Sequence, residues 1–208
     1  METLTDEQWG RQESADWWSA GQASRHHIYG AATAMMLDVA ALQPGSRVLD
    51  VAAGTGEQTL LAARRVGPRG YALAADISAR MLNVAAEAAR TEGLTHVETC
   101  LMHAEHLALD ADAFDAVICR IALMLFPHPA IALAEMRRVV KAGGKIAVMV
   151  YSALDKNPYH GIFYAIVRRL GNIPSPPPGE PWMYALGHPG ALEDLYKRAG
   201  FLNRHYRK

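Results

Sequence analysis

Short apolar runs alternate with stretches of helical periodicity through most of the chain. Five of these runs have the length and character of strands, and they lie at residues 47–52, 70–75, 96–101, 114–119 and 145–151. Strands separated by helices pair in parallel, with helices on both faces of the sheet. The pattern therefore predicts a three-layer α/β fold with a Rossmann-like, mostly parallel sheet, which binds its ligand at the carboxyl ends of the strands.

Helical spacing is clearest in residues 78–91, where apolar positions recur at i, i+3, i+4 and i+7. A second helix is predicted over residues 129–140, and the pair Gly143-Gly144 is expected to close it. Before the first strand, the pattern predicts helices at residues 5–19 and 24–41.

The length of 208 residues suits one domain with one substantial core. We expect four parts: an N-terminal helical cover (1–43), a cofactor-binding core (44–156), a lid (157–187), and a last helix with the start of a sixth strand (188–208). The lid is inferred because a Pro-rich stretch, residues 171–181, interrupts the pattern after the fifth strand. A simple linker is the alternative.

Composition narrows the class of partner. The 21 basic and 21 acidic residues cancel, which disfavours nucleic acid and anionic membrane surfaces as partners. No apolar run reaches the roughly 18 residues that a membrane helix requires. The two cysteines and the absence of a basic leader followed by an apolar stretch indicate free thiols and a cytoplasmic protein. We expect a small-molecule partner.

The segment VLDVAAGTGEQTL, residues 48–60, carries the clearest chemical signal. A dinucleotide-binding turn would have a third glycine where Thr59 stands, and Asp50 would repel a pyrophosphate. S-Adenosylmethionine has no phosphate, and its sulfonium and ammonium groups are attracted to an acid. Asp76 ends the second strand, where a carboxylate can accept hydrogen bonds from both ribose hydroxyls.

Four segments resemble the class I S-adenosylmethionine-dependent methyltransferases, and within them the group of ubiquinone and menaquinone biosynthesis methyltransferases. They are VLDVAAGTGEQTL, ALAADISARML, FDAVICRIALMLFPHP and EMRRVVKAGGKIAVMVYS, and they follow one another between residues 44 and 201. The resemblance implies S-adenosylmethionine as cofactor and S-adenosylhomocysteine as product.

The resemblance also implies a set of cofactor-binding residues. These are Asp50, Ala52, Ala53, Gly54, Thr55 and Gly56 at the methionine end, Asp76 at the ribose, Ile77 and Met81 around the adenine, and Met102, His103 and Ala104 along the adenine edge. The chain departs from the family pattern at His103, where an aspartate is usual. A neutral histidine accepts from the adenine amino group only through its unprotonated nitrogen.

Each of these residues also has a structural interpretation. Asp50 could cap a turn, Asp76 could cap the following helix, and Met81 could be ordinary core. His103 and His106 lack acidic or cysteine partners at metal spacing, so we expect no metal site.

Methyl transfer demands little acid–base chemistry, because it is an in-line displacement on an activated sulfonium. The catalytic candidates are Arg120, His27 and Tyr151. Arg120 follows the fourth strand and is always charged, so it would bind the cofactor region and orient an acidic or enolic acceptor. An ion pair with a nearby carboxylate is the alternative role of Arg120.

The predicted function is methyl transfer from S-adenosylmethionine to oxygen or carbon of a small apolar or aromatic acceptor. The aromatic residues that suggest such an acceptor, or simple lid packing, are Tyr159, Phe163, Tyr164, Trp182 and Tyr184. Two rival interpretations are a catalytically silent family member that binds cofactor or partners only, and an NAD(P)-dependent oxidoreductase on the same sheet.

The end of the sequence raises a question about the sheet. A helix at residues 190–199 precedes FLNRHYRK, which is similar to the start of the family's sixth strand. In that family the strand order is 3-2-1-4-5-7-6, and the seventh strand bridges the fifth and sixth. Without it, the fifth strand would expose unpaired backbone groups. We expect either a shortened form of a longer protein or a homodimer in which another chain covers this edge.

Overall fold

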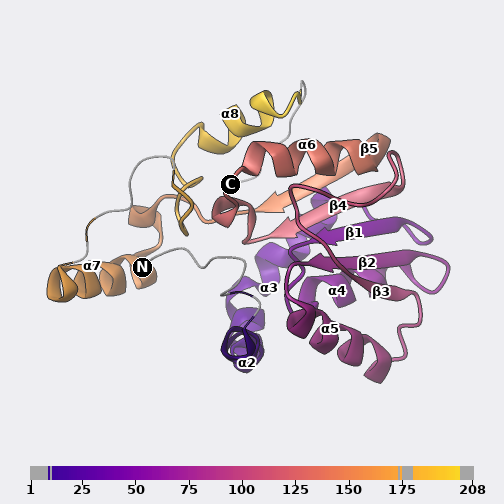
Figure 1. The fold of residues 1–208 in the computed structure, drawn as a ribbon, viewed down its shortest axis with the longest axis horizontal. Coiled ribbons are helices and arrows are strands. Elements are labelled where there is room, and N and C mark those ends of the chain that lie inside the picture. Colours follow the sequence, from indigo (N-terminus) through magenta and orange to yellow (C-terminus); the bar gives the residue numbers. More distant parts are fainter. Residues whose placement is uncertain (1–8, 10, 173, 175–179, 202–208) are drawn as a thin grey trace.

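Five parallel strands form one sheet in the order β3-β2-β1-β4-β5 (Figure 1). They are β1 (Arg47–Val51), β2 (Tyr71–Asp76), β3 (Val97–Leu101), β4 (Phe114–Arg120) and β5 (Val140–Met149). The structure is a computed structural model, and it describes residues 9, 11–172, 174 and 180–201. The predicted α/β class and the parallel pairing are confirmed.

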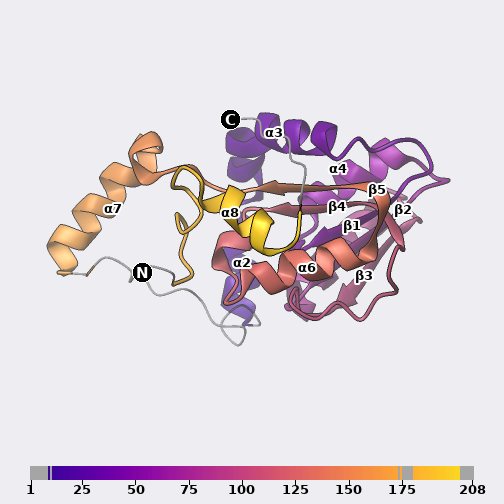
Figure 2. The same cartoon turned by 90° about the horizontal axis from the view of Figure 1, so that it is seen from above.

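Helices cover both faces of this sheet. The helices whose bounds the structure describes are α2 (Gln12–Ala20), α3 (Gln22–Val39), α4 (Glu57–Val66), α5 (Ala79–Thr91), α6 (Pro129–Val139), α7 (Pro158–Gly171) and α8 (Ala191–Arg198), with short 3-10 turns η1 (Leu123–Leu125) and η2 (Leu154–Lys156). Figure 2 shows α3 and α4 on one side of the sheet and α6 and α8 on the other.

Two apolar clusters hold these layers together. Because successive side chains of a strand point to opposite faces, β1 contributes to both clusters. Val48 packs in one cluster with Leu37 of α3 and Ala63 of α4. Leu49 packs in the other with Leu133 of α6. Burial on both faces fixes the strands relative to one another, and therefore fixes where their carboxyl ends meet.

The start of β5 differs from the prediction. The strand begins at Val140, directly after α6, so the glycine pair that was expected to close the helix lies within the strand. The register against β4 shifts there, as in a β-bulge. Gly143 has a φ of +80°, and a Cβ on Gly144 would lie 2.7 Å from the carbonyl oxygen of Asp115. The glycines therefore permit the bulge and the close approach of β4.

The outer parts of the chain are described only in part. Helices α2, α3 and α8 lie within the predicted helical stretches, give or take two residues. The predicted helix start at residue 5, most of the Pro-rich stretch, and residues 202–208 of the expected sixth strand lie outside the described residues. Among the described strands, β5 pairs only with β4. The homodimer stays a prediction.

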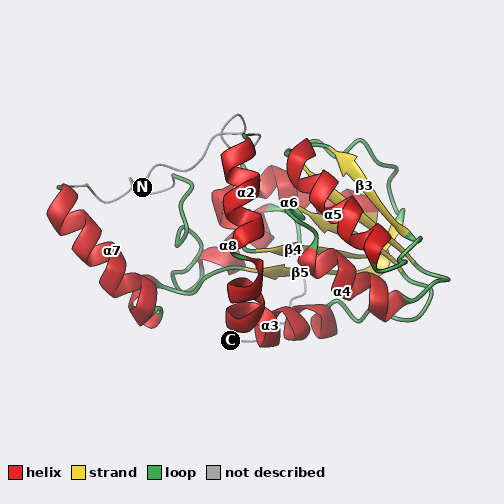
Figure 3. Cartoon of the chain, turned by 90° about the horizontal axis from the view of Figure 1, so that it is seen from below, coloured by secondary structure: helices red, strands yellow, loops and turns green. Residues whose placement is uncertain are grey.

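Helix α7 projects sideways from the rest of the molecule (Figure 3). The element that it contacts most is η2, and five large apolar side chains of α7 are exposed: Ile162, Phe163, Ile166, Val167 and Leu170. A lid formed by residues 157–187 stays a prediction. Within the described residues, no helix has both the length and the apolar character needed to cross a bilayer.

Packing of α6 on the sheet gives the first testable prediction. Leu133 is fully buried, whereas Ile131 on the same helix is 50% exposed. We expect Leu133→Ala to lower the free energy of unfolding by about 3 kcal/mol because it leaves a cavity in the core. Ile131→Ala, the control, should cost about 0.5 kcal/mol. Urea denaturation measures both; equal losses would contradict the assigned face of α6.

Candidate functional site

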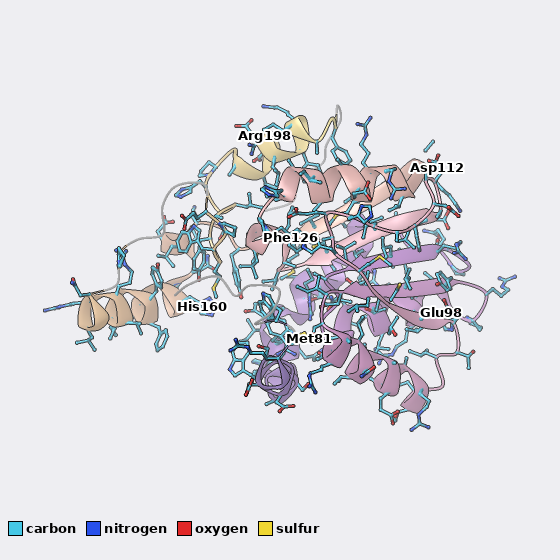
Figure 4. The ribbon with its side chains drawn as sticks, in the orientation of Figure 1. Met81, Glu98, Asp112, Phe126, His160 and Arg198 are labelled. Atoms are coloured by element: carbon cyan, nitrogen blue, oxygen red, sulfur yellow. The ribbon has the colours of Figure 1, made fainter. Side chains whose placement is uncertain are left out.

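A cavity of about 610 Å³ opens at the carboxyl ends of the central strands. Its size lies within the range of small-molecule sites. The predicted residues that line it are Ala52, Gly54, Asp76, Ile77, Met81, Met102, His103, Ala104 and Arg120. Met81 of α5 and Phe126, which follows η1, both border it and are labelled in Figure 4. The loops after β1, β2, β3 and β4 therefore converge on one site.

Asp76 joins two of these loops. Its Oδ2 accepts from the backbone N–H of Gly54 at 2.8 Å, and its Oδ1 accepts from the N–H of Ser78, also at 2.8 Å. The side chain is buried, and burial raises its pKa while these N–H groups oppose the rise. Each carboxylate oxygen has more than one lone pair, so Asp76 can still accept from a ligand in the cavity.

Asp50 lies behind the cavity wall instead of lining it. Its carboxylate is 1% exposed and accepts from the side chains of Gln58 and Thr59 in the first turn of α4. Burial raises the pKa of Asp50 to about 7. The structure therefore places Asp50 as the residue that fixes the turn to α4, which is the structural role considered for it, and gives it no direct path to a ligand.

Three other residues of the glycine turn point into the protein and do not line the cavity. Ala53 and Thr55 are buried and, like Gly56, do not line the cavity. A Cβ on Gly56 would lie 2.6 Å from the Cβ of Ala85. Packing of α5 on the turn therefore requires a glycine at position 56. The cofactor-binding role of Gly56 stays a prediction.

Gly54 and its neighbours form the cavity wall. A Cβ on Gly54 would lie 3.0 Å from Nε1 of Trp18, so the glycine allows the indole to approach the turn. Ala52 and Ile121 also line the cavity, and both have a positive φ, +56° and +55°. Such a conformation costs a non-glycine residue about 1 kcal/mol or more, and it concentrates at functional sites.

Arg120 borders the cavity and is held by a buried ion pair. Its Nη2 donates to Oε2 of Glu57 at 2.8 Å, and its Nη1 donates to the hydroxyl of Thr33 at 3.1 Å. Both charged residues are 7% exposed. The ion pair that was the alternative role of Arg120 is thus present, and it fixes the guanidinium at the cavity wall.

His27 and Tyr151 do not border the cavity. His27 is exposed on α3, whereas the hydroxyl of Tyr151 is hydrogen-bonded to that of Tyr29. Burial raises the pKa of Tyr151, so the phenol stays protonated near neutral pH and is a poor base. A catalytic role for either residue stays a prediction that this geometry does not support.

His103 lines the cavity with a defined orientation. Its Nδ1 accepts from the backbone N–H of Glu105 at 3.2 Å, which leaves the proton of a neutral ring on Nε2. We expected the unprotonated ring nitrogen to accept a hydrogen bond from the adenine amino group. That nitrogen is Nδ1, so such a bond would compete with this internal hydrogen bond.

Several lining residues were not predicted. They are Trp9, Val51, Trp18, Ala75, Leu107, Ile121, Ala122, Leu125, Phe126, Pro127 and Pro181. Leu125, Phe126 and Pro127 lie within the family-like segment FDAVICRIALMLFPHP, so its continuation past Arg120 was a usable signal. Nothing in the spacing of Trp9 and Trp18 connects them with the glycine turn; for Trp18, the contact depends on how α2 packs against α5 and α3.

The sheet order 3-2-1-4-5, together with the likeness to solved structures, shows a Rossmann-like methyltransferase fold. A putative methyltransferase from Bacillus halodurans is similar, with a TM-score of 0.63, 27% identity, and coverage of 82% of this chain and 69% of that one. The [4+2]-cyclase SpnF is similar with a TM-score of 0.53 and 31% identity, over 57% of this chain and 43% of that one.

The ubiE/COQ5 methyltransferase family model matches residues 23–208, so the chain belongs to that family. The ubiquinone/menaquinone biosynthesis C-methyltransferase UbiE of Ralstonia nicotianae is 42% identical over 54% of this chain and 46% of its own length. The same-named protein of Vibrio campbellii is 31% identical over 82% of this chain and 70% of its own length. The chain spans about half the length of several curated relatives that it matches.

The buried acid behind the turn gives a pH prediction. The pKa of Asp50 is about 7 in the folded protein and about 3.9 in an unfolded chain. The folded state therefore holds a proton that the unfolded state has lost, and this contribution to stability, full below about pH 4, is lost as the pH rises through 7.

Asp50→Asn removes this titration and keeps an oxygen acceptor. We expect the difference in free energy of unfolding, wild type minus Asp50→Asn, to fall by on the order of 3 kcal/mol between pH 4 and pH 8. Denaturant unfolding of both proteins across this range measures it. A difference that does not change with pH would show that Asp50 titrates normally.

Proposed function

We propose that this protein is an S-adenosylmethionine-dependent methyltransferase that acts on oxygen or carbon of a small apolar or aromatic acceptor. Family membership supports the reaction class. The observation that carries the proposal is the position of Asp76, a buried carboxylate at the end of β2 that borders the cavity beside the turn at Gly54. A carboxylate at this place suits the two hydroxyls of a ribose.

The remaining lining residues fit the other parts of this cofactor. Ile77 and Met81 present apolar side chains beside Asp76, as a flat adenine requires. Nε2–H of His103 suits a ring nitrogen of the adenine as acceptor. Ala52 and Gly54 supply the small residues that a methionine end needs. When bound, the cofactor supplies a methyl group already activated on a sulfonium.

The acceptor is expected to lie on the side of the cavity toward η1. Leu125 and Phe126 line it there, and Trp18 and Pro181 approach from α2 and from the segment after α7. Such a lining favours an apolar or aromatic molecule and excludes water from the reacting atoms. Arg120 supplies a fixed positive charge at the same wall, which favours an acceptor whose hydroxyl ionises as it reacts.

A second candidate function is ligand binding in this fold without methyl transfer. The observation that favours this second candidate is the similarity to SpnF, which is described as a [4+2]-cyclase. An NAD(P)-dependent oxidoreductase is disfavoured because Thr59 stands where the third glycine of the dinucleotide turn would lie.

Replacement of Asp76 tests the cofactor assignment. We expect Asp76→Asn to weaken binding of S-adenosylhomocysteine by about 2 kcal/mol, because charge-assisted hydrogen bonds to the ribose are lost. The matched control is Asp115→Asn, since Asp115 also accepts from a backbone N–H, that of Arg47, but at the opposite end of the sheet. Isothermal titration calorimetry should show unchanged affinity for the control; unchanged affinity for Asp76→Asn would refute the assignment.

Turnover separates the two candidate functions. We expect wild-type protein to release S-adenosylhomocysteine when it is incubated with S-adenosylmethionine and a panel of catechols, phenols and quinols. Mass spectrometry of the acceptor identifies the methylated atom. Tight binding of S-adenosylhomocysteine without turnover on any member of the panel would favour the binding function.

A further inference from the structure

Three charged residues meet behind the cavity wall, where α3, α4 and β4 pack together. Arg25, Glu57 and Arg120 come from these three elements, and each is at least nine-tenths buried. Glu57 already forms the ion pair with Arg120. His26 approaches the other oxygen of Glu57 at 3.4 Å, and its side chain is 66% exposed. One buried carboxylate therefore lies in a cluster with two permanently charged guanidinium groups, and it forms an ion pair with that of Arg120.

Two members of this cluster have incomplete hydrogen bonds. Oε1 of Glu57 is buried and has no hydrogen-bond partner among the described residues. Arg25 has two such atoms, Nε and Nη2. Its guanidinium carbon lies 4.2 Å from the ring centroid of Trp18. This cation–π contact favours the positive charge but leaves the N–H groups unsatisfied, and a buried donor without an acceptor is costly.

Trp18 connects Arg25 with the cavity. The indole lines the cavity and contacts the turn at Gly54, while Arg25 packs against the same ring and does not itself line the cavity. A movement of Trp18 would therefore open a path from the cavity to the unsatisfied N–H groups. Trp18 belongs to α2, whose contacts with the sheet are few beside those of α3.

We propose that Arg25, with Arg120 beside it, forms an oxyanion subsite of the cavity that takes a carboxylate from the ligand when Trp18 moves aside. A guanidinium binds a carboxylate through two parallel N–H bonds, which suits the two unsatisfied nitrogens. Glu57 binds Arg120 through Oε2 at 2.8 Å, and its Oε1 has no hydrogen-bond partner among the described residues, so neither oxygen satisfies the two nitrogens of Arg25. The subsite rests on the proposed function in one respect: the ligand that carries the carboxylate is the cofactor or the acceptor of that function.

Two molecules of the proposed reaction could supply this carboxylate: the cofactor, through its amino-acid end, and an acidic acceptor. The test therefore uses two pairs of probes that differ in the carboxylate. The first pair is S-adenosylhomocysteine and its decarboxylated analogue S-adenosyl-3-thiopropylamine. The second is 3,4-dihydroxybenzoate and its methyl ester, added to protein saturated with S-adenosylhomocysteine.

Isothermal titration calorimetry of wild type, Arg25→Met and Arg25→Lys with the four probes measures how much the guanidinium of Arg25 contributes to carboxylate binding. We expect Arg25→Met to weaken the binding of one of the two carboxylate probes by about tenfold or more. The binding of its neutral counterpart should weaken by less than about twofold. The pair that responds identifies the source. Arg25→Lys keeps the charge without the planar fork and should lose an intermediate amount; it also serves if Arg25→Met does not fold. Arg64→Met, on the exposed side of α4, is the control and should bind all four probes as wild type does.

Two results would overturn the subsite: equal affinities of wild type and Arg25→Met for both carboxylates, or a wild type that binds neither carboxylate more tightly than its neutral partner. Failure of the proposed function has a different signature, because wild type would then bind neither S-adenosylhomocysteine nor its decarboxylated analogue. In that case the benzoate pair, titrated without cofactor, still decides the subsite.

Discussion

The ligand cavity depends on one buried carboxylate that accepts hydrogen bonds from two backbone N–H groups. Asp76 ends β2 and holds the N–H of Gly54 in the turn after β1 and the N–H of Ser78 at the start of α5. The backbone N–H of Ala53 also donates to the carbonyl oxygen of Ala75, at 3.0 Å, so backbone and side chain together join the turn after β1 to the end of β2. The two bonds that Asp76 accepts offset the cost of burying the charge, which leaves the carboxylate poised to receive hydroxyl groups from a ligand.

Further buried ionisable residues lie behind Asp76 and support the cavity wall. Asp50 fixes the turn to α4 through Thr59 and Gln58, and Glu57 holds Arg120 at the wall. These residues lie at the ends of adjacent parallel strands or at the start of the next helix, so the topology itself gathers them. Methyl transfer suits such a site, because it needs a fixed, dry geometry more than it needs an acid or a base.

The sequence predicted the parts of this structure that depend on local pattern. All five strands, the parallel pairing and the gathering of Gly54, Asp76 and Met81 around one cavity follow from apolar runs and the acids that end them. The bulge at Gly143 did not, because a glycine pair after a helix also closes helices. The inward position of Asp50 did not either, since a strand-end acid has the same spacing whether it faces a ligand or a helix. Trp18 reaches Gly54 through the packing of α2 against α5 and α3, which no local pattern encodes.

The choice of ligand is the claim on which the account rests, and one comparison tests it directly. Calorimetric titration of the same protein sample with S-adenosylhomocysteine and with NADH compares a ligand without phosphate with one that carries a pyrophosphate. Membership of the methyltransferase family, and Thr59 at the place where a dinucleotide turn has its third glycine, predict that S-adenosylhomocysteine binds and that NADH does not. Binding of NADH in preference to S-adenosylhomocysteine would contradict the account.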